Sequence, residues 1–307
     1  MTDALHIPVL LSEVVAGIAP KDDGIYVDAT FGAGGYSSAV LDAANCKVYG
    51  IDRDPFAIEN GQKLVEKYNG RLTLLHGVFG DMRELLASAG VEKVDGVMMD
   101  IGVSSMQIDT AQRGFSFQKN GALDMRMSQE GLSAADVVNS FKEKDLADLI
   151  YAYGEERFSR RIARAIVEKR REKPFETTLE LASAVHSVMP KSKDGIDSAT
   201  RTFQALRIYV NDELEQLRRG LNEAEGLLNK GARMAVVSFH SLEDRIVKTF
   251  MQEKSGKSAG VSRYEPQAAQ TRATLRLLTK KPVLPSTQEC ERNPRSRSSR
   301  LRIAEAI

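Results

Sequence analysis

Short apolar runs alternate with helical patterns over the first third of the chain. The apolar runs predict four buried strands, at residues 24–31, 47–54, 72–79 and 94–102. Helical periodicity follows the first three of them, starting near Ser37 and covering 55–68 and 82–90. Pro55 suits the first turn of its helix, because proline lacks the N–H that a first turn leaves unpaired. Strand–helix alternation of this kind predicts a parallel sheet with helices on both faces.

The pattern changes between about Asp109 and Thr200, where we predict no buried strand. Helical patterns dominate there, at 133–141, 143–154, 157–172 and 178–189. Apolar residues then step by three or four along 201–228, which predicts one long amphipathic helix.

The α/β pattern resumes after this helix. We expect a fifth buried strand at 232–241 and a helix behind it at 242–251. A polar loop at 251–273 and two closing strands at 274–281 and 298–307 are expected to follow. The prediction is therefore an α/β domain made of residues 1–110 and 201–307, interrupted by an all-helical inserted domain at 111–200 that serves substrate recognition.

Composition narrows the class of protein. The 307 residues carry a net charge of only +1, so any affinity for nucleic acid must come from a local patch. Cys46 and Cys290 are far apart and the four histidines are scattered, which gives neither a disulfide framework nor a metal-ligand spacing. We see no signal peptide and no apolar run of about 18 residues that could span a membrane. We expect a cytoplasmic protein with no metal and no membrane attachment.

A glycine-rich loop, "FGAGGYSS" at 31–38, follows the first predicted strand. Glycine lets a ligand approach the backbone closely, and ligands of open parallel sheets bind beyond the carboxyl ends of the strands. A tight turn that binds nothing is the alternative. A dinucleotide fingerprint would need glycine or alanine at position 37, which is Ser37, and no G-K-[ST] follows to form a P-loop.

Acidic residues end the neighbouring strands. Asp28, Asp52 and Asp100, together with Phe79, are expected to rim one crevice beside the loop. The Asp52 carboxylate could accept hydrogen bonds from a ribose diol, which both NAD and S-adenosylmethionine present. No lysine or arginine lies between Gly24 and Cys46, so the crevice suits a sulfonium cation better than a pyrophosphate. This charge pattern favours S-adenosyl-L-methionine.

Many blocks of the chain, in order, resemble the MraW-type methyltransferase family. They include "HIPVLLSEVV" (6–15), "DATFGAGGYS" (28–37), "GIDRDPFAI" (50–58), "DIGVSSMQID" (100–109), "YGEERFSRRIARAIV" (153–167), "ATRTFQALRIYVNDEL" (199–214) and "VSFHSLEDRIVK" (237–248). The resemblance implies a class I (Rossmann-like) methyltransferase sheet with an inserted helical domain. It also implies transfer of methyl from S-adenosylmethionine to N4 of a cytidine in 16S ribosomal RNA, near the decoding centre of the small subunit.

Carried over by position, the resemblance implies a set of cofactor contacts: Gly34, Gly35, Tyr36, Asp52, Phe79, Asp100 and Gln107. Many members of the family have histidine at the position of Tyr36. The sequence does not decide whether this residue would contact the cofactor through its backbone or its side chain. A homodimer is left open.

The acceptor amine needs a hydrogen-bond acceptor, because the lone pair of a cytosine amine is delocalised into the ring. Many amino-methyltransferases carry D/N/S-P-P-Y/F/W after the fourth strand, where this chain reads "DIGVSS". Asp100, Ser104, Ser105 and His240 are the catalytic candidates. The serines could instead cap a turn, and His240 could cap the next helix. Methylation of a ring carbon would need a cysteine near Asp100, and neither Cys46 nor Cys290 is expected there.

Local basic stretches mark candidate RNA contacts. "RNPRSRSSRLR" (292–302) is rich in arginine, and we predict that Arg295 and Arg297 bind RNA phosphates. Arg113 and Phe115 could hold an unpaired base, although Phe115 and Phe117 could instead anchor the insertion. A non-catalytic RNA-binding assembly factor, and a methyltransferase acting on DNA or protein, remain the alternatives.

Overall fold

The chain forms two units in a computed structural model that describes residues 8–190, 195, 197–256 and 272–307. The first unit contains residues 1–102 and 214–307, and the second contains residues 103–213. No helix in the described ranges combines the length and the apolar character that crossing a membrane requires.

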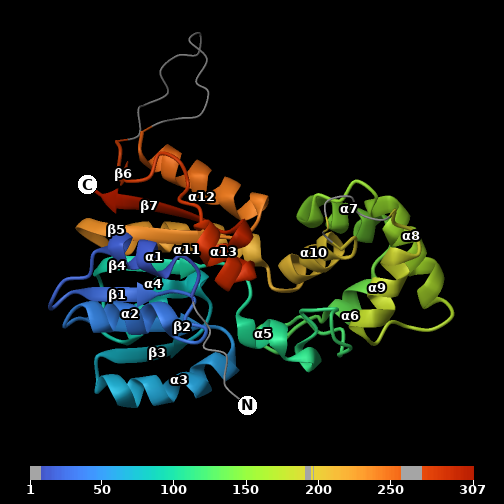
Figure 1. Cartoon of the computed structure of the whole chain (residues 1–307), viewed down its shortest axis with the longest axis horizontal. Helices are drawn as coiled ribbons and strands as arrows, with labels where there is room; N and C mark the ends of the chain where they lie inside the picture. Colours follow the sequence, from blue (N-terminus) through green and yellow to red (C-terminus); the bar gives the residue numbers. More distant parts are fainter. Residues whose placement is uncertain (1–7, 191–194, 196, 257–271) are drawn as a thin grey trace, which may run out of the picture. The chain divides into compact units, whose positions relative to one another are not determined.

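The first unit is built on one seven-stranded sheet (Figure 1). The strand order is β3-β2-β1-β4-β5-β7-β6. The strands are β1 (Ile25–Asp28), β2 (Lys47–Asp52), β3 (Leu72–His76), β4 (Val94–Asp100), β5 (Leu228–Ser238), β6 (Leu275–Leu277) and β7 (Arg300–Ala306). The first five strands pair in parallel, whereas β7 pairs antiparallel with β5 and β6. This is the strand order of the class I methyltransferase fold, so the predicted fold class is confirmed.

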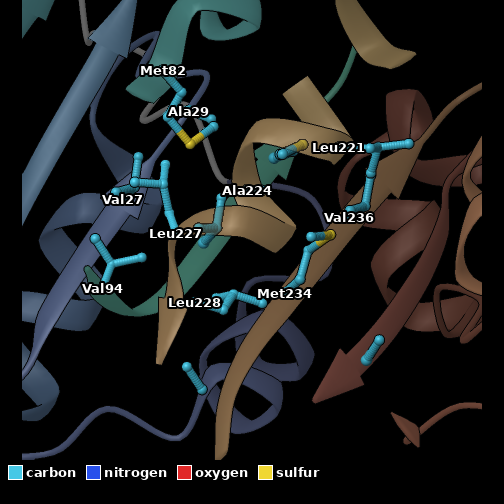
Figure 2. Packing of buried hydrophobic residues seen from close by; sticks show 14 of the residues in the cluster. Val27, Ala29, Met82, Val94, Leu221, Ala224, Leu227, Leu228, Met234 and Val236 are labelled. Carbon is cyan, nitrogen blue, oxygen red and sulfur yellow. The ribbon is translucent and has the colours of Figure 1, made fainter. Parts of the chain in front are cut away.

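Helices cover both faces of this sheet. The helices of the unit are α1 (Leu11–Ile18), α2 (Gly35–Ala43), α3 (Pro55–Tyr68), α4 (Met82–Ser88), α11 (Glu213–Leu227), α12 (Ser241–Lys254) and α13 (Thr287–Arg292), with 3₁₀ turns η1 (Phe79–Asp81) and η3 (Pro294–Ser298). One core joins the sheet to α4, α11 and α12, and Figure 2 shows Met82, Leu221 and Leu227 meeting strand residues such as Val27 and Val236. The other core joins the opposite face to α1, α2 and α3.

The second unit is helical, as the pattern predicts. Its helices are α5 (Ser105–Asp109), α6 (Ala134–Ser140), α7 (Glu143–Gly154), α8 (Ser159–Arg170), α9 (Thr178–His186) and α10 (Thr200–Val210), with the 3₁₀ turn η2 (Ala111–Arg113). Ser133 and Thr177 begin α6 and α9 with capping boxes. A core of small and aliphatic residues, including Leu146, Ile162 and Leu206, holds these helices together.

The prediction of one helix over 201–228 is wrong. The chain leaves the helical conformation at Asn211 and Asp212, and Asp212 has a φ of 50°. The Asn211 side chain is buried and donates to the Met125 carbonyl at 2.7 Å, while its Oδ1 accepts from the Met127 N–H at 2.8 Å. The hydrophobic spacing continues through this break, so periodicity alone could not reveal it.

The boundaries of the units also differ from the expected ones. They lie at 102/103 and 213/214 rather than near 110 and 201, because α5 and α10 belong to the helical unit, where α10 packs against α7. Helices α1 and α13 were not predicted. Helix α12 continues to Lys254, so the expected polar loop begins later, and its residues 257–271 lie outside the described ranges.

Candidate functional site

The glycine loop leads directly into α2 without a capping side chain. Gly34 occupies the cap position with a φ of 75°, which favours glycine. A Cβ atom on Gly34 would lie 2.5 Å from Leu64 Cδ1, and one on Gly35 would lie 2.1 Å from Pro8 Cγ. Gly34 is therefore required by its backbone conformation and by packing, and Gly35 by packing. The first turn of α2 still offers backbone N–H groups at the positive end of a helix.

Asp28, the last residue of β1, is hydrogen-bonded to the end of the glycine loop. Its Oδ2 accepts hydrogen bonds from the Ser37 hydroxyl at 2.7 Å and the Ser37 N–H at 3.1 Å. The carboxyl group is fully buried, and burial raises its pKa to about 6 even though the bonds from Ser37 act in the opposite direction. Ser37 thus links the end of β1 to the first turn of α2 through these two hydrogen bonds.

Asp52 ends β2 and fixes the other side of the loop. Its Oδ2 accepts from the Gly32 N–H at 2.7 Å, and its Oδ1 accepts from the Asp54 N–H at 2.8 Å. Burial raises the pKa of this carboxyl as well, against these two backbone hydrogen bonds. Each carboxylate oxygen keeps a second lone pair, so both can accept one more hydrogen bond.

Asp100 ends β4 on the same side of the sheet as Asp28 and Asp52. The register pairs Asp28 with Gly50 and with Met98, so Asp52 and Asp100 each stand two residues further along their strands. Side chains two residues apart on a strand share a face. The structure therefore brings the three predicted acids together at one edge of the sheet.

Asp100 differs from the other two acids in its hydrogen bonding. Its Oδ1 is buried and has no hydrogen-bond partner in the described part of the chain. Burial raises its pKa well above the usual range, and the neighbouring charges of Asp28 and Glu243 act in the same direction. A buried acceptor without a donor is costly, so this atom suits a donor or a cation supplied by a ligand.

Two further residues implied as cofactor contacts belong to the same unit. Phe79 follows β3 and packs against α11, where a Cβ on Gly220 would lie 2.3 Å from Phe79 Cδ2. Tyr36 is buried in the first turn of α2, and its hydroxyl donates to the Val9 carbonyl. The Tyr36 side chain is therefore occupied by the protein, which leaves its backbone as the group that a ligand could contact.

Ser104, Ser105 and Gln107 lie in the helical unit. Ser104 begins α5 with a capping box, in which its hydroxyl accepts from the Gln107 N–H at 3.2 Å and Gln107 Oε1 accepts from the Ser104 N–H at 3.0 Å. Capping is the alternative role that the sequence allows for the serines. It is the role that these contacts show for Ser104, and Ser105 is the first residue of the helix.

His240 begins α12. The Glu243 N–H donates to His240 Nδ1 at 3.4 Å, and the His240 and Phe239 N–H groups donate back to Glu243 Oε2 at 3.2 and 2.8 Å. His240 Nε2 lies 3.0 Å from the fully buried Glu243 Oε1. These contacts match the capping alternative for His240.

The candidate RNA-binding residues differ in how far their side chains are already engaged by the protein. Arg113 donates to the carbonyls of Arg126 and Met127 at 3.1 and 3.0 Å and lies over the Phe115 ring, while Phe115 and Phe117 pack against the helical core. Arg295 and Arg297 are exposed on η3 in the first unit. The contacts of Arg113 and Phe115 therefore lie within the helical unit, whereas the two tail arginines face solvent.

Comparison with known proteins gives the family. The model of the MraW methylase family matches residues 3–307. Ribosomal RNA small subunit methyltransferase H of Paramagnetospirillum magneticum is 57% identical over 306 residues, which cover 99% of this chain and 96% of the relative. The protein of the same name from Rhodospirillum rubrum is 54% identical, over 98% of this chain and 94% of the relative.

Solved structures resemble the chain more distantly. An rRNA methylase from Streptococcus thermophilus is 10% identical, with a TM-score of 0.43, over 96% of this chain and 93% of its own. The strand order of this chain, rather than that likeness, gives the fold class. Because the family model and relatives at more than half identity span nearly the whole sequence, the chain belongs to the MraW methylase family.

Proposed function

We propose that this chain is an rRNA methyltransferase that transfers methyl from S-adenosylmethionine to N4 of a cytidine in 16S rRNA, near the decoding centre. The relatives named above are methyltransferases of small-subunit ribosomal RNA, which supports the class of reaction and substrate. The observation that supports this cofactor is the group of strand-end acids, Asp28, Asp52 and Asp100, none of which forms a salt bridge in the described ranges. Burial raises the pKa of each carboxyl, and the charge of Arg53 opposes this effect at Asp52.

The residues present suit this methyl donor. S-adenosylmethionine supplies an electrophilic methyl group on a positively charged sulfur, beside an ammonium group and a ribose diol. The unpartnered Asp100 Oδ1 suits a cationic ligand, and the free lone pairs of Asp52 suit the diol. The backbone N–H groups of Gly34, Gly35 and Tyr36 would receive polar groups of the donor. Phe79 and Gln107 complete the proposed contacts on the strength of the family resemblance.

Asp100 is also our proposed acceptor for an N4 hydrogen. A carboxylate that accepts this hydrogen bond draws the nitrogen toward tetrahedral geometry, so that its lone pair can face the methyl group. Positioning of this kind supplies much of the acceleration in group transfer. Ser104 and His240 already cap helices, so Asp100 is the candidate with a free buried acceptor. Ser105 and the backbone of 102–105 are secondary candidates.

Methylation of a ring carbon fits the described residues less well. That reaction needs a cysteine nucleophile beside the base. Cys46 is buried just before β2 begins, and Asp52 ends that strand at the opposite edge of the sheet. Cys290 lies on α13 in the tail. These placements support transfer to the exocyclic amine.

The proposal is tested by methylating small ribosomal subunits that lack the modification, using labelled S-adenosylmethionine, and digesting the RNA to nucleosides. We expect label in N4-methylcytidine from a single position of 16S rRNA. Label in another atom or another nucleoside would contradict the proposed acceptor. Label in DNA or protein, or no transfer by a protein that still binds the subunit, would instead establish one of the alternative functions.

A further inference from the structure

We propose that the N-terminal segment Pro8–Leu10 acts as a strap that fixes the first turn of α2 for the cofactor, with Glu289 and Tyr36 as the positioning residues that hold it. The proposal rests on the proposed function, because it assigns these residues to the same cofactor loop. The strap joins three parts of the chain that are distant in sequence, namely the N-terminal segment, the glycine loop and the C-terminal tail.

The strap lies directly on the glycine loop. A Cβ on Gly35 would lie 2.1 Å from Pro8 Cγ, so Pro8 occupies the space beside the first residue of α2. One residue further, the Val9 carbonyl accepts the hydrogen bond of the Tyr36 hydroxyl. Burial raises the pKa of Tyr36 well above its usual range, so the hydroxyl keeps its proton at any pH at which the enzyme would work. Two consecutive strap residues thus contact two consecutive residues of the proposed cofactor turn.

The other end of the strap is held by the tail. Glu289 Oε1 accepts the hydrogen bond of the Leu10 N–H at 2.7 Å, across 279 positions of sequence. Leu10 has a φ of 52° and a ψ of 34°, a left-handed conformation that is unfavourable for a residue with a Cβ. It is fully buried and begins α1 without a side-chain cap. A strained, buried residue needs a specific partner to persist, and the Glu289 carboxylate supplies one.

A fixed loop benefits binding more than chemistry. Amide donors that are already oriented lose less conformational freedom when the ligand binds. If the strap loosens, we expect weaker binding of the methyl donor in both the ground state and the transition state. Such a change raises the KM for the donor and leaves kcat nearly unchanged.

The test compares four variants. Glu289→Ala removes the acceptor of the Leu10 N–H, Glu289→Gln retains an acceptor oxygen, and Tyr36→Phe removes the donor to Val9. Glu291→Ala is the matched control, because Glu291 is exposed on the same helix. The readouts are the Kd of S-adenosylmethionine by calorimetry, the KM for donor and RNA separately, and amide hydrogen exchange at residues 35–37 in the ligand-free protein.

We expect Glu289→Ala to weaken donor binding about tenfold, in line with the loss of one hydrogen bond to a charged group. Tyr36→Phe should weaken it severalfold, Glu289→Gln should recover most of the loss, and Glu291→Ala should resemble wild type. Exchange at 35–37 should quicken in Glu289→Ala. Unchanged exchange and unchanged Kd in Glu289→Ala, or a loss confined to kcat, would overturn the strap. Absence of donor binding by wild type would instead overturn the proposed function. The exchange rates of the ligand-free protein would still test whether the strap fixes residues 35–37.

Discussion

The strand-end acids of the first unit and the ion-paired acids of the helical unit have opposite electrostatic surroundings. At the strand ends of the first unit, burial raises the pKa of Asp28, Asp52 and Asp100. In the helical unit, the carboxyl of Glu180 bonds to Lys173 at 2.8 Å, and its pKa falls to about 2. Asp124 lies 2.6 Å from Arg126, whose hydrogen bonds outweigh burial and lower its pKa.

The contrast between raised and lowered carboxyl pKa values does not simply separate the sheet-containing unit from the helical unit. Asp244, in the first unit, accepts from Arg302 at 2.7 Å and from Arg300 at 2.9 Å, and these bonds lower its pKa despite burial. Glu180, Asp124 and Asp244 each have a cationic partner within the chain. The three strand-end acids are costly to ionise within the chain alone, and a cationic ligand would remove much of that cost. Proteins keep such groups where function requires them, and this difference identifies the candidate site.

The largest expected effect comes from Asp100→Asn. It removes the charge of the acid whose Oδ1 lacks a partner, and we expect methyl transfer to small subunits to fall by a factor of about 100 or more. The control is Asp95→Asn at the start of the same strand, where the carboxylate accepts from Ile25 N–H and from Asn229. Methyl-transfer rates that fall equally in both variants would show that the charge of Asp100 has no role beyond that of Asp95 at the start of the strand.

Asp28→Asn tests the cost of the buried charge through stability. In wild type, the pKa of Asp28 rises from 3.8 to about 6 on folding, so the folded state binds the proton more tightly. The free energy of unfolding is therefore lowered as pH rises between these values, and the penalty persists above about pH 6. The free energy of unfolding of Asp28→Asn relative to that of wild type should therefore be about 2 kcal/mol higher at pH 7.5 than at pH 4. Denaturant melts at both pH values measure it, and a difference that does not vary with pH would refute the raised pKa.

The smallest expected effect concerns the tail. Arg295→Ala and Arg297→Ala should each weaken RNA binding severalfold and reduce the dependence of log K on log salt by a little under one. Lys63→Ala, an exposed change on α3, is the control for net charge. An unchanged salt slope in the arginine variants would remove η3 from the RNA surface and leave the phosphate contacts to be found elsewhere.

Local signals predicted much of the fold. The bounds of α3 follow from Pro55 at its start, with Asp54 capping the Phe56 N–H, and α7 spans the predicted 143–154. The three acids could be placed together because carboxyl ends of parallel strands share an edge. The break at Asn211 and the bond between Leu10 and Glu289 could not be predicted, since each depends on contacts between residues distant in sequence. The role of Ser37 had a weak signal, namely a hydroxyl in the first turn after a strand that ends in an acid.

The central claim is that the strand-end acids of the first unit bind a cationic methyl donor. Calorimetric titration of the wild-type protein with S-adenosylmethionine, repeated from about pH 8 down to about pH 5, tests it most directly. We predict one binding site whose affinity decreases as the pH falls and the carboxyl groups of Asp28 and Asp100 take up protons. Absence of binding heat at neutral pH, or an affinity that does not change with pH, would contradict the account.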